Sequence, residues 1–299
     1  MRIVFVALCL LWSSALFAAD ETYQQIMRDR ASYGRVIHLF GDSIFRGWAL
    51  TVFPEEASDE VKASPKWALR SPGVMLGLML GDATVAGYAS QLGLPYRQDV
   101  ANRIDHINNL VDTGIIRSDD VVVFEDAGVH ASDPDLYEDL WRGLFQAVSG
   151  KARVFVVDMF DYLTQETYGD LPSDAYRFGV TFQGTATGRW RSHNDATKAA
   201  ATQARVEILP LNAAMGRFRD DVLKRYKIDV VHSDGIHPNI WGQCLVSAMI
   251  ARAAHPGFDQ RPRSALLRAF REAEPRTKPR KVDGLVSMCL SHAILQTGP

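Results

Sequence analysis

Two short stretches of this chain carry residues that together can perform nucleophilic chemistry. The first, "GDSI" at 41–44, places Ser43 directly after an apolar run. The second, "DGIHPN" at 234–239, holds Asp234 and His237. A serine hydroxyl needs a neighbouring base to become a nucleophile, and a carboxylate fixes the tautomer of an imidazole that acts as this base. We therefore expect a catalytic triad, with Ser43 as nucleophile, His237 as base and Asp234 as the partner of the base.

Other interpretations of the same kinds of residue stay open. Asp42 or Ser43 could cap the helix that follows, because either side chain can accept an N–H of the first turn. His232 is a rival base, although its place at a strand end is more typical of a packed core histidine. We expect His38 in the core for the same reason, and His106 in solvent on the polar side of a helix.

The sequence indicates neither a metal nor a cofactor. Its histidines do not stand at metal-ligand spacing beside a carboxylate. The first strand-like run is followed by neither a glycine-rich phosphate loop nor a dinucleotide-binding fingerprint. The formal net charge of −2 gives no reason to expect a nucleic acid or a membrane surface as partner.

Short apolar runs that alternate with helical patterns must position these residues. Continuous runs are typical of strands covered on both faces. Five runs predict strands: Arg35–Phe40, Ala83–Ala86, Val121–Phe124, Arg153–Asp158 and Ile228–Val231. Apolar residues at helical spacing predict helices from Asp99 to Gly114, from Pro134 to Gly150 and after Asn239. This alternation predicts a parallel α/β sheet in one domain, whose carboxyl edge carries both reactive stretches.

The two stretches resemble the first and last blocks of the SGNH (GDSL-type) hydrolases. "LPLNAAM" at 209–215 is also similar to the run that leads into the last block, so the resemblance extends from about Val36 to Ala254. It implies a three-layer α/β/α sandwich with a five-stranded parallel sheet of flavodoxin-like type. It further implies ester hydrolysis or acyl transfer through an acyl-serine, without metal, and the same roles for the three triad residues.

The resemblance also implies two donors that hold the oxyanion of the reaction. One is the backbone amide of Ser43, at the start of a helix. The other is the amide of a glycine in the second block, for which "VAGYASQLGLP" offers Gly87 and Gly93. We prefer Gly93, because Gly87 comes immediately after a predicted strand and can serve the turn.

The third block departs from the family pattern. An asparagine is expected after the third strand, but "EDAGVH" stands there and Ala127 occupies its position. Three explanations compete: the N–H of Gly128 or the ring of His130 replaces the missing amide, the reaction is slow or specialised, or the domain binds rather than catalyses. Glu125 and Asp126 would repel a developing negative charge unless protonated. Either residue could contact substrate, or both could cap N–H groups of a turn at the strand end.

The ends of the chain predict export and a separate tail. Residues 1–19 are typical of a signal peptide, with an uncleaved anchor as the alternative. The predicted domain covers 20–254, with insertions near 49–75 and 159–193. Residues 255–299 are basic and are expected to form a solvated extension, interrupted by a short amphipathic helix around Leu266, Leu267 and Phe270.

Two cysteines remain once the predicted signal peptide is removed. Cys244 and Cys289 either form a disulfide, as an oxidising compartment permits, or stay as buried thiols. A bridge between them would tie the tail to the helix that follows Asn239.

These features together predict a periplasmic or extracellular serine esterase. Its substrate would be a small-molecule or polysaccharide ester. The aromatic residues within 162–190 could stack on the sugar rings of an O-acetylated carbohydrate or serve as ordinary packing, and lipid or short acyl esters are equally open. An O-acyltransferase with the same triad and a catalytically weak carbohydrate-binding module are the alternatives. The sequence indicates no oligomeric state.

Overall fold

Five parallel strands form where the chain has short apolar runs. They are β1 (Val36–Phe40), β2 (Thr84–Gly87), β3 (Val121–Phe124), β4 (Arg153–Val157) and β5 (Glu207–Leu209). Their order across the sheet is β2-β1-β3-β4-β5. This is the flavodoxin-like, doubly wound order, in which sites form outside the carboxyl ends of the strands. The predicted α/β class and five-stranded parallel sheet are confirmed in the computed structural model, which describes residues 25–41, 43–46, 58–81, 84–87, 97–125, 134–158, 186–231 and 237–294.

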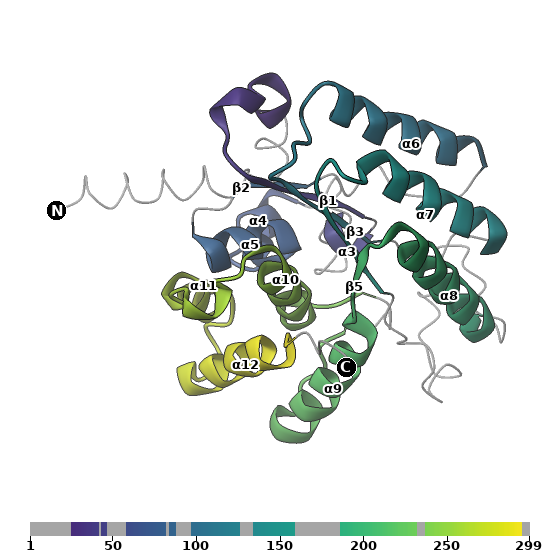
Figure 1. Ribbon diagram of the computed structural model, residues 1–299. Helices are drawn as coiled ribbons and strands as arrows, with labels where there is room; N and C mark the ends of the chain where they lie inside the picture. Colours follow the sequence, from purple (N-terminus) through teal and green to yellow (C-terminus); the bar gives the residue numbers. More distant parts are fainter. Residues whose placement is uncertain are drawn as a thin grey trace.

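Helices cover both faces of this sheet (Figure 1). One face is covered by α6 (Arg97–Asp112), α7 (Pro134–Val148) and α8 (Ala186–Ala204). The other is covered by α5 (Pro72–Leu80), α9 (Leu211–Tyr226) and α10 (Ile240–Ala254). The described residues also form α3 (Ser43–Arg46), α4 (Asp59–Lys62), α11 (Ser264–Ala273) and α12 (Pro279–His292), with short 3-10 turns at Arg30–Ser32, Trp67–Leu69 and Phe258–Gln260.

The core divides into two parts because successive residues of a strand point to opposite faces of the sheet. Val121 and Val123 of β3 belong to the part that includes α10. Phe124 points to the other face, where its ring lies 6.0 Å from that of Trp141 and 5.9 Å from that of Phe145 on α7. All the β3 side chains are buried, as the uninterrupted apolar run predicts.

A buried ionic cluster closes the amino edge of the sheet. Arg30 forms a two-pronged ion pair with Asp120, and the same carboxylate accepts a hydrogen bond from the amide of Val36. His38 Nε2 lies 3.1 Å from Asp120 Oδ2. Burial alone would raise the pKa of Asp120, but the hydrogen bonds from His38, Arg30 and Val36 outweigh it and lower the pKa to about 2. The prediction that His38 is a packed core residue is confirmed.

The fifth strand is not the one that the sequence predicts. Residues Ile228–Val231 form no strand, and Val231 makes only an isolated bridge to Pro238. The side chain of Asp229 accepts hydrogen bonds from Arg219 and from the amide of Val231, so side-chain contacts also hold this segment, which does not pair with the sheet. The strand beside β4 is Glu207–Leu209, which is short and partly exposed at the sheet edge.

The C-terminal segment is not the solvated extension that its basic composition suggests. The predicted amphipathic helix is present as α11, and Phe270 on it stacks on Trp241 of α10 with ring centroids 4.7 Å apart. A further helix, α12, contributes Val282, Leu285 and other apolar side chains to the core that α10 shares. The charged residues face outward, so the segment is polar in composition but amphipathic in structure.

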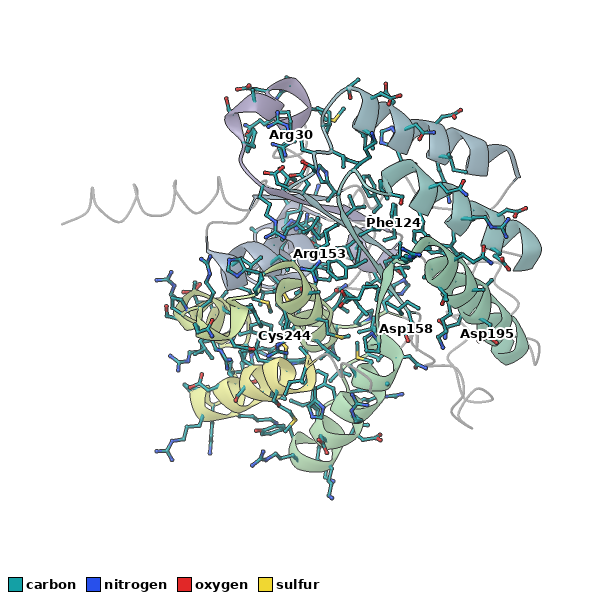
Figure 2. The ribbon with its side chains drawn as sticks, in the orientation of Figure 1. Arg30, Phe124, Arg153, Asp158, Asp195 and Cys244 are labelled. Carbon is teal, nitrogen blue, oxygen red and sulfur yellow. A yellow bond between two sulfur atoms is a disulfide. The ribbon has the colours of Figure 1, made fainter. Side chains whose placement is uncertain are left out.

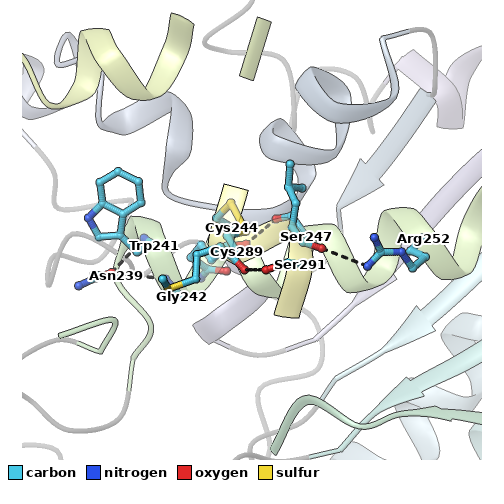
Figure 3. The surroundings of a disulfide bond; sticks show 11 residues. Asn239, Trp241, Gly242, Cys244, Ser247, Arg252, Cys289 and Ser291 are labelled. Carbon is cyan, nitrogen blue, oxygen red and sulfur yellow. Dashed lines mark hydrogen bonds between the residues drawn. A yellow bond between two sulfur atoms is a disulfide. The ribbon is translucent and has the colours of Figure 1, made fainter. Parts of the chain in front are cut away.

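A disulfide joins α12 to α10. Cys244 and Cys289 are bonded, their Cα atoms lie 6.2 Å apart, and neither side chain is exposed. That separation lies in the usual range for a disulfide. The bond lies within the interface between the two helices (Figure 3), which decides the question that the sequence left open.

The predicted insertions contain regular structure where they are described. Residues 58–75 hold α4, a 3-10 turn and the start of α5, and residues 186–193 belong to α8. The α6 and α7 helices agree with the predicted ones to within two residues, and each is followed by a glycine with positive φ, Gly114 and Gly150. Among the described residues, none of the helices combines the length and the apolar character needed to cross a bilayer.

Candidate active site

The turn after β1 is shaped by a glycine that cannot be replaced without a clash. A methyl group on Gly41 would lie 2.6 Å from Cδ2 of Phe45 and 2.7 Å from Oε2 of Glu125. Glycine therefore lets the chain pass from β1 into α3 at close quarters. Ser43 begins α3, so its backbone lies at the carboxyl edge of the sheet, where the sequence predicts the nucleophile.

In the second predicted stretch, backbone contacts join the chain that precedes His237 to the two residues that follow it. Pro238 pairs with Val231 in an antiparallel bridge, and the amide of Asn239 donates to the carbonyl of Val230. These two contacts bring Val230 and Val231 beside the residues that directly follow His237. His237 directly precedes Pro238 and is only 5% exposed, so its side chain is buried close to the start of α10.

The start of α10 is fixed against the same segment. Asn239 caps the helix, because its side-chain oxygen accepts from the amides of Trp241 and Gly242 while its nitrogen donates to Asp229 O. Figure 3 shows this cap in the surroundings of the disulfide. A methyl group on Gly242 would lie 2.5 Å from Val230 O, so the helix approaches the preceding chain too closely for any side chain there.

One hydrogen bond joins the first predicted stretch to the helix that follows the second. Nε2 of Gln243, in the first turn of α10, donates to the carbonyl of Ile44 over 2.8 Å. Ile44 follows Ser43, and Gln243 lies six residues after His237. The structure therefore brings the α3 segment and the start of α10 together at one edge of the sheet.

Two buried carboxylates follow neighbouring strands at this edge. Glu125 comes directly after β3 and is 3% exposed, with its oxygen close to the Gly41 backbone. Asp158 comes directly after β4, and its Oδ1 accepts from the amide of Asn212 in the first turn of α9 over 2.8 Å. Burial raises the pKa of Asp158 to about 6 although this hydrogen bond opposes the shift. Figure 2 shows Asp158 away from Arg30, which lies at the amino edge.

Several predicted site residues lie outside the described residues. They are Asp42, Gly93, Asp126, Gly128, His130, the rival base His232, and Asp234, together with the side chain of Ser43. Their predicted roles are therefore neither confirmed nor contradicted.

The structure contradicts the sequence prediction for His106. His106 is not solvated as predicted: it is half-buried on α6, and burial lowers its pKa. Among the residues that the structure describes, no group of three or more His, Cys, Asp or Glu side chains has the arrangement of a metal site.

Comparison with known proteins gives structural likenesses at low identity. No family model matches the chain, and no curated protein matches it. It is similar to LAE5, an α/β hydrolase enzyme from the metagenome of Lake Arreo, Spain, with 14% identity, coverage of 74% of this chain and 95% of that one, and a TM-score of 0.47. It is also similar to the lipase/acylhydrolase from Enterococcus faecalis, with 17% identity, 77% and 99% coverage and a TM-score of 0.45.

A third likeness is to Axe2, an acetylxylan esterase from Geobacillus stearothermophilus. The identity is 13%, the coverage is 74% of this chain and 94% of that one, and the TM-score is 0.45. These TM-scores are below 0.5, so the fold of this chain rests on its own strand order and register.

Two residues of this edge were not found from the sequence. Gln243 is separated from its partner by 199 positions, so no local pattern could indicate their hydrogen bond. Asp158 ends the predicted run Arg153–Asp158, so the apolar pattern assigns it to the strand. A carboxylate at the end of an apolar run is the signal that could have marked it as a group at the carboxyl edge.

Proposed function

We propose that this protein is an exported serine esterase, which hydrolyses carboxylic esters through an acyl-serine. The observation that carries this proposal is the hydrogen bond from Gln243 to Ile44, because it ties the segment that begins with Ser43 to the helix that follows His237. A nucleophile and a base must lie within hydrogen-bond reach, and these two segments are adjacent at the sheet edge where sites form in this fold.

In the proposed reaction, the Ser43 hydroxyl oxygen attacks the ester carbonyl as His237 takes its proton. The tetrahedral intermediate collapses, the C–O bond to the alcohol breaks, and the alcohol leaves with the proton from His237. Water then attacks the acyl-serine, again losing a proton to the imidazole, and the acid is released as Ser43 regains its proton. Asp234 orients the imidazole and stabilises its charged form.

Amide groups hold the negative charge on the carbonyl oxygen in this proposal. The donors are the backbone N–H groups of Ser43 and Gly93, with the N–H of Gly128 or the ring of His130 in place of the missing asparagine. Losing one donor of this kind typically costs on the order of a hundred- to a thousandfold in rate. Asp126 is proposed to lie near the substrate.

Two features support an exported protein that acts on carbohydrate esters. A buried disulfide between Cys244 and Cys289 fits an oxidising compartment, and it agrees with the predicted signal peptide at residues 1–19. The aromatic residues within 162–190 can stack on sugar rings, which favours an O-acetylated polysaccharide as substrate.

A fluorophosphonate probe tests the nucleophile. The wild type should be labelled, and Ser43→Ala should not. The matched control is Ser58→Ala, because Ser58 also stands at the start of a helix but its hydroxyl accepts from the amide of Val61 as an ordinary cap. Labelling of Ser43→Ala at the wild-type rate would exclude the assignment, as would a wild type that takes up no probe and hydrolyses no ester.

The substrate is tested by product analysis. The purified protein is incubated with acetyl esters, longer acyl esters and acetylated xylan or cellulose fragments, with and without a free sugar acceptor. Release of free acid at a rate that the acceptor does not change supports hydrolysis. Acyl sugar formed in place of free acid would instead identify a transferase.

A further inference from the structure

The amide of Gln243 is buried, but it belongs to neither of the two predicted stretches. The residue has no exposed surface and sits in the first turn of α10. Its nitrogen donates to Ile44 O, and among the described residues its oxygen Oε1 has no hydrogen-bond partner. A buried side-chain amide whose oxygen lacks a hydrogen bond carries a free-energy cost. The hydrogen bond to Ile44 O partly offsets this cost.

The acceptor is a carbonyl that a short helix leaves without an internal partner. The last four carbonyls of an α-helix have no N–H group of the same helix to bind. Because α3 has only four residues, Ser43–Arg46, each of its carbonyls needs a partner from elsewhere. Gln243 supplies that partner to Ile44, which directly follows the proposed nucleophile.

The donor comes from a helix turn that is held from several sides. Asn239 caps α10, Trp241 stacks on Phe270 of α11, and Cys244 is bonded to Cys289 of α12. A side chain that projects from such a fixed turn can act as a rigid spacer. The hydrogen bond from Gln243 therefore fixes the position of Ile44, and so of the start of α3, relative to α10, the helix that begins beside His237.

We propose that Gln243 is a positioning residue, which sets the separation between the Ser43 hydroxyl and the His237 imidazole through its hydrogen bond to Ile44 O. This inference rests on the proposed esterase function. Gln243 does not touch the reacting atoms, so its loss should lower turnover without weakening substrate binding. A misplacement of about 1 Å in such a pair can cost on the order of a hundredfold in rate.

The test compares Gln243→Met with Ser247→Ala in the full-length protein. Methionine keeps the length of the side chain but cannot donate. Ser247 is the matched control, because it is also buried on α10 and its hydroxyl donates only to the carbonyl of Gln243, within the helix. The readouts are the rate of fluorophosphonate labelling, kcat and KM for an acetyl ester, and amide hydrogen exchange across 43–46. The kinetic constants are measured at a temperature well below the thermal unfolding midpoint of each variant.

Gln243→Met should label and turn over roughly ten- to a hundredfold more slowly. Its KM should change by less than about twofold, as for an interaction that matters to the transition state alone. Hydrogen exchange in α3 should accelerate, whereas Ser247→Ala should match the wild type in all three measurements. If Gln243→Met does not fold, Gln243→Asn replaces it, because the shorter amide stays polar but cannot reach Ile44 O.

Each other outcome overturns at least one of the two proposals. Labelling and kcat at wild-type levels in Gln243→Met would refute the positioning role and leave the esterase in place. An equal loss in Ser247→Ala would also refute it, because the loss would then come from a general loosening of α10. A wild type that is not labelled and hydrolyses no ester would refute the esterase itself, and the positioning role with it.

Discussion

Breaking the Cys244–Cys289 disulfide should destabilise the protein without disturbing the packing around it. The bond spans 45 residues of sequence. The chain-entropy relation gives about 4 kcal/mol at 25 °C for a loop of this length, and removal of a native disulfide commonly costs about 2–5 kcal/mol. We expect the reduced protein to lose about 2–4 kcal/mol of its free energy of unfolding. Both cysteines are fully buried, so the two thiols still fill the same space after reduction.

Guanidinium unfolding followed by circular dichroism measures this loss. The oxidised protein, the reduced protein and the double variant Cys244→Ala/Cys289→Ala are compared. Peptide mapping under non-reducing conditions first establishes that the two cysteines are linked. The slope of the free energy of unfolding against denaturant concentration should become steeper on reduction, because an unfolded chain without a cross-link exposes more surface.

The double variant is the control for the reductant itself. Its unfolding midpoint should not change when dithiothreitol is added. Equal midpoints for the verified oxidised and reduced wild type would refute the reasoning, because the cross-link would then restrict nothing that the folded helices do not already restrict. A double variant with a much lower free energy of unfolding than the reduced wild type would show that the sulfur atoms stabilise the protein mainly by filling the core.

Three further substitutions test other parts of the structure. Gly41→Ala should cost about 1–3 kcal/mol by overpacking against Phe45, whereas Gly34→Ala, with nothing within 4 Å of its added methyl group, should be neutral in the same thermal melt. Asp158→Asn should stabilise the protein by about 2–3 kcal/mol at pH 8, because a carboxyl with a pKa raised to about 6 destabilises the fold once ionised, and this gain should vanish near pH 4. Asp120→Asn should lower the free energy of unfolding by about 3–5 kcal/mol at neutral pH, because it leaves a buried arginine without its ionic partner. The variant should also lose less stability than the wild type as the pH falls from about 4 to about 2, the range set by the lowered pKa of Asp120. Acid titrations that are the same for the wild type and these two aspartate variants would refute both pKa assignments.

The sequence predicts the strands well where the sheet is buried on both faces. The β1 and β3 strands have every side chain buried, so their apolar runs are continuous and their limits were predicted to within one residue. The β5 strand lies at the edge of the sheet, and only Leu209 of its three residues is buried. Its pattern is therefore too weak to detect, while Ile228–Val231 has an apolar pattern although it pairs with no strand of the sheet.

The types of residue that do chemistry can be found from sequence more easily than the residues that hold them. Ser43 and His237 stand in short stretches with turn residues around them, so each has a local signal. The hydrogen bond between Gln243 and Ile44 and the packing of α12 on α10 depend on contacts between distant parts of the chain. A basic segment such as 255–299 also hides its apolar stripe, because composition averages over both faces of a helix.

The distance along the chain between Gln243 and Ile44 has a consequence for the moment at which the protein becomes active. At a synthesis rate of roughly 5–20 residues per second, about 10–40 seconds pass between the two ends of this contact leaving the ribosome. During that interval the segment of the proposed nucleophile lacks both the amide that holds it and the histidine that would activate it. On the proposed mechanism, a nascent or truncated chain should therefore not hydrolyse esters in the compartment where it is made, and the proposed hydrolysis should begin only once the last third of the polypeptide has joined the fold.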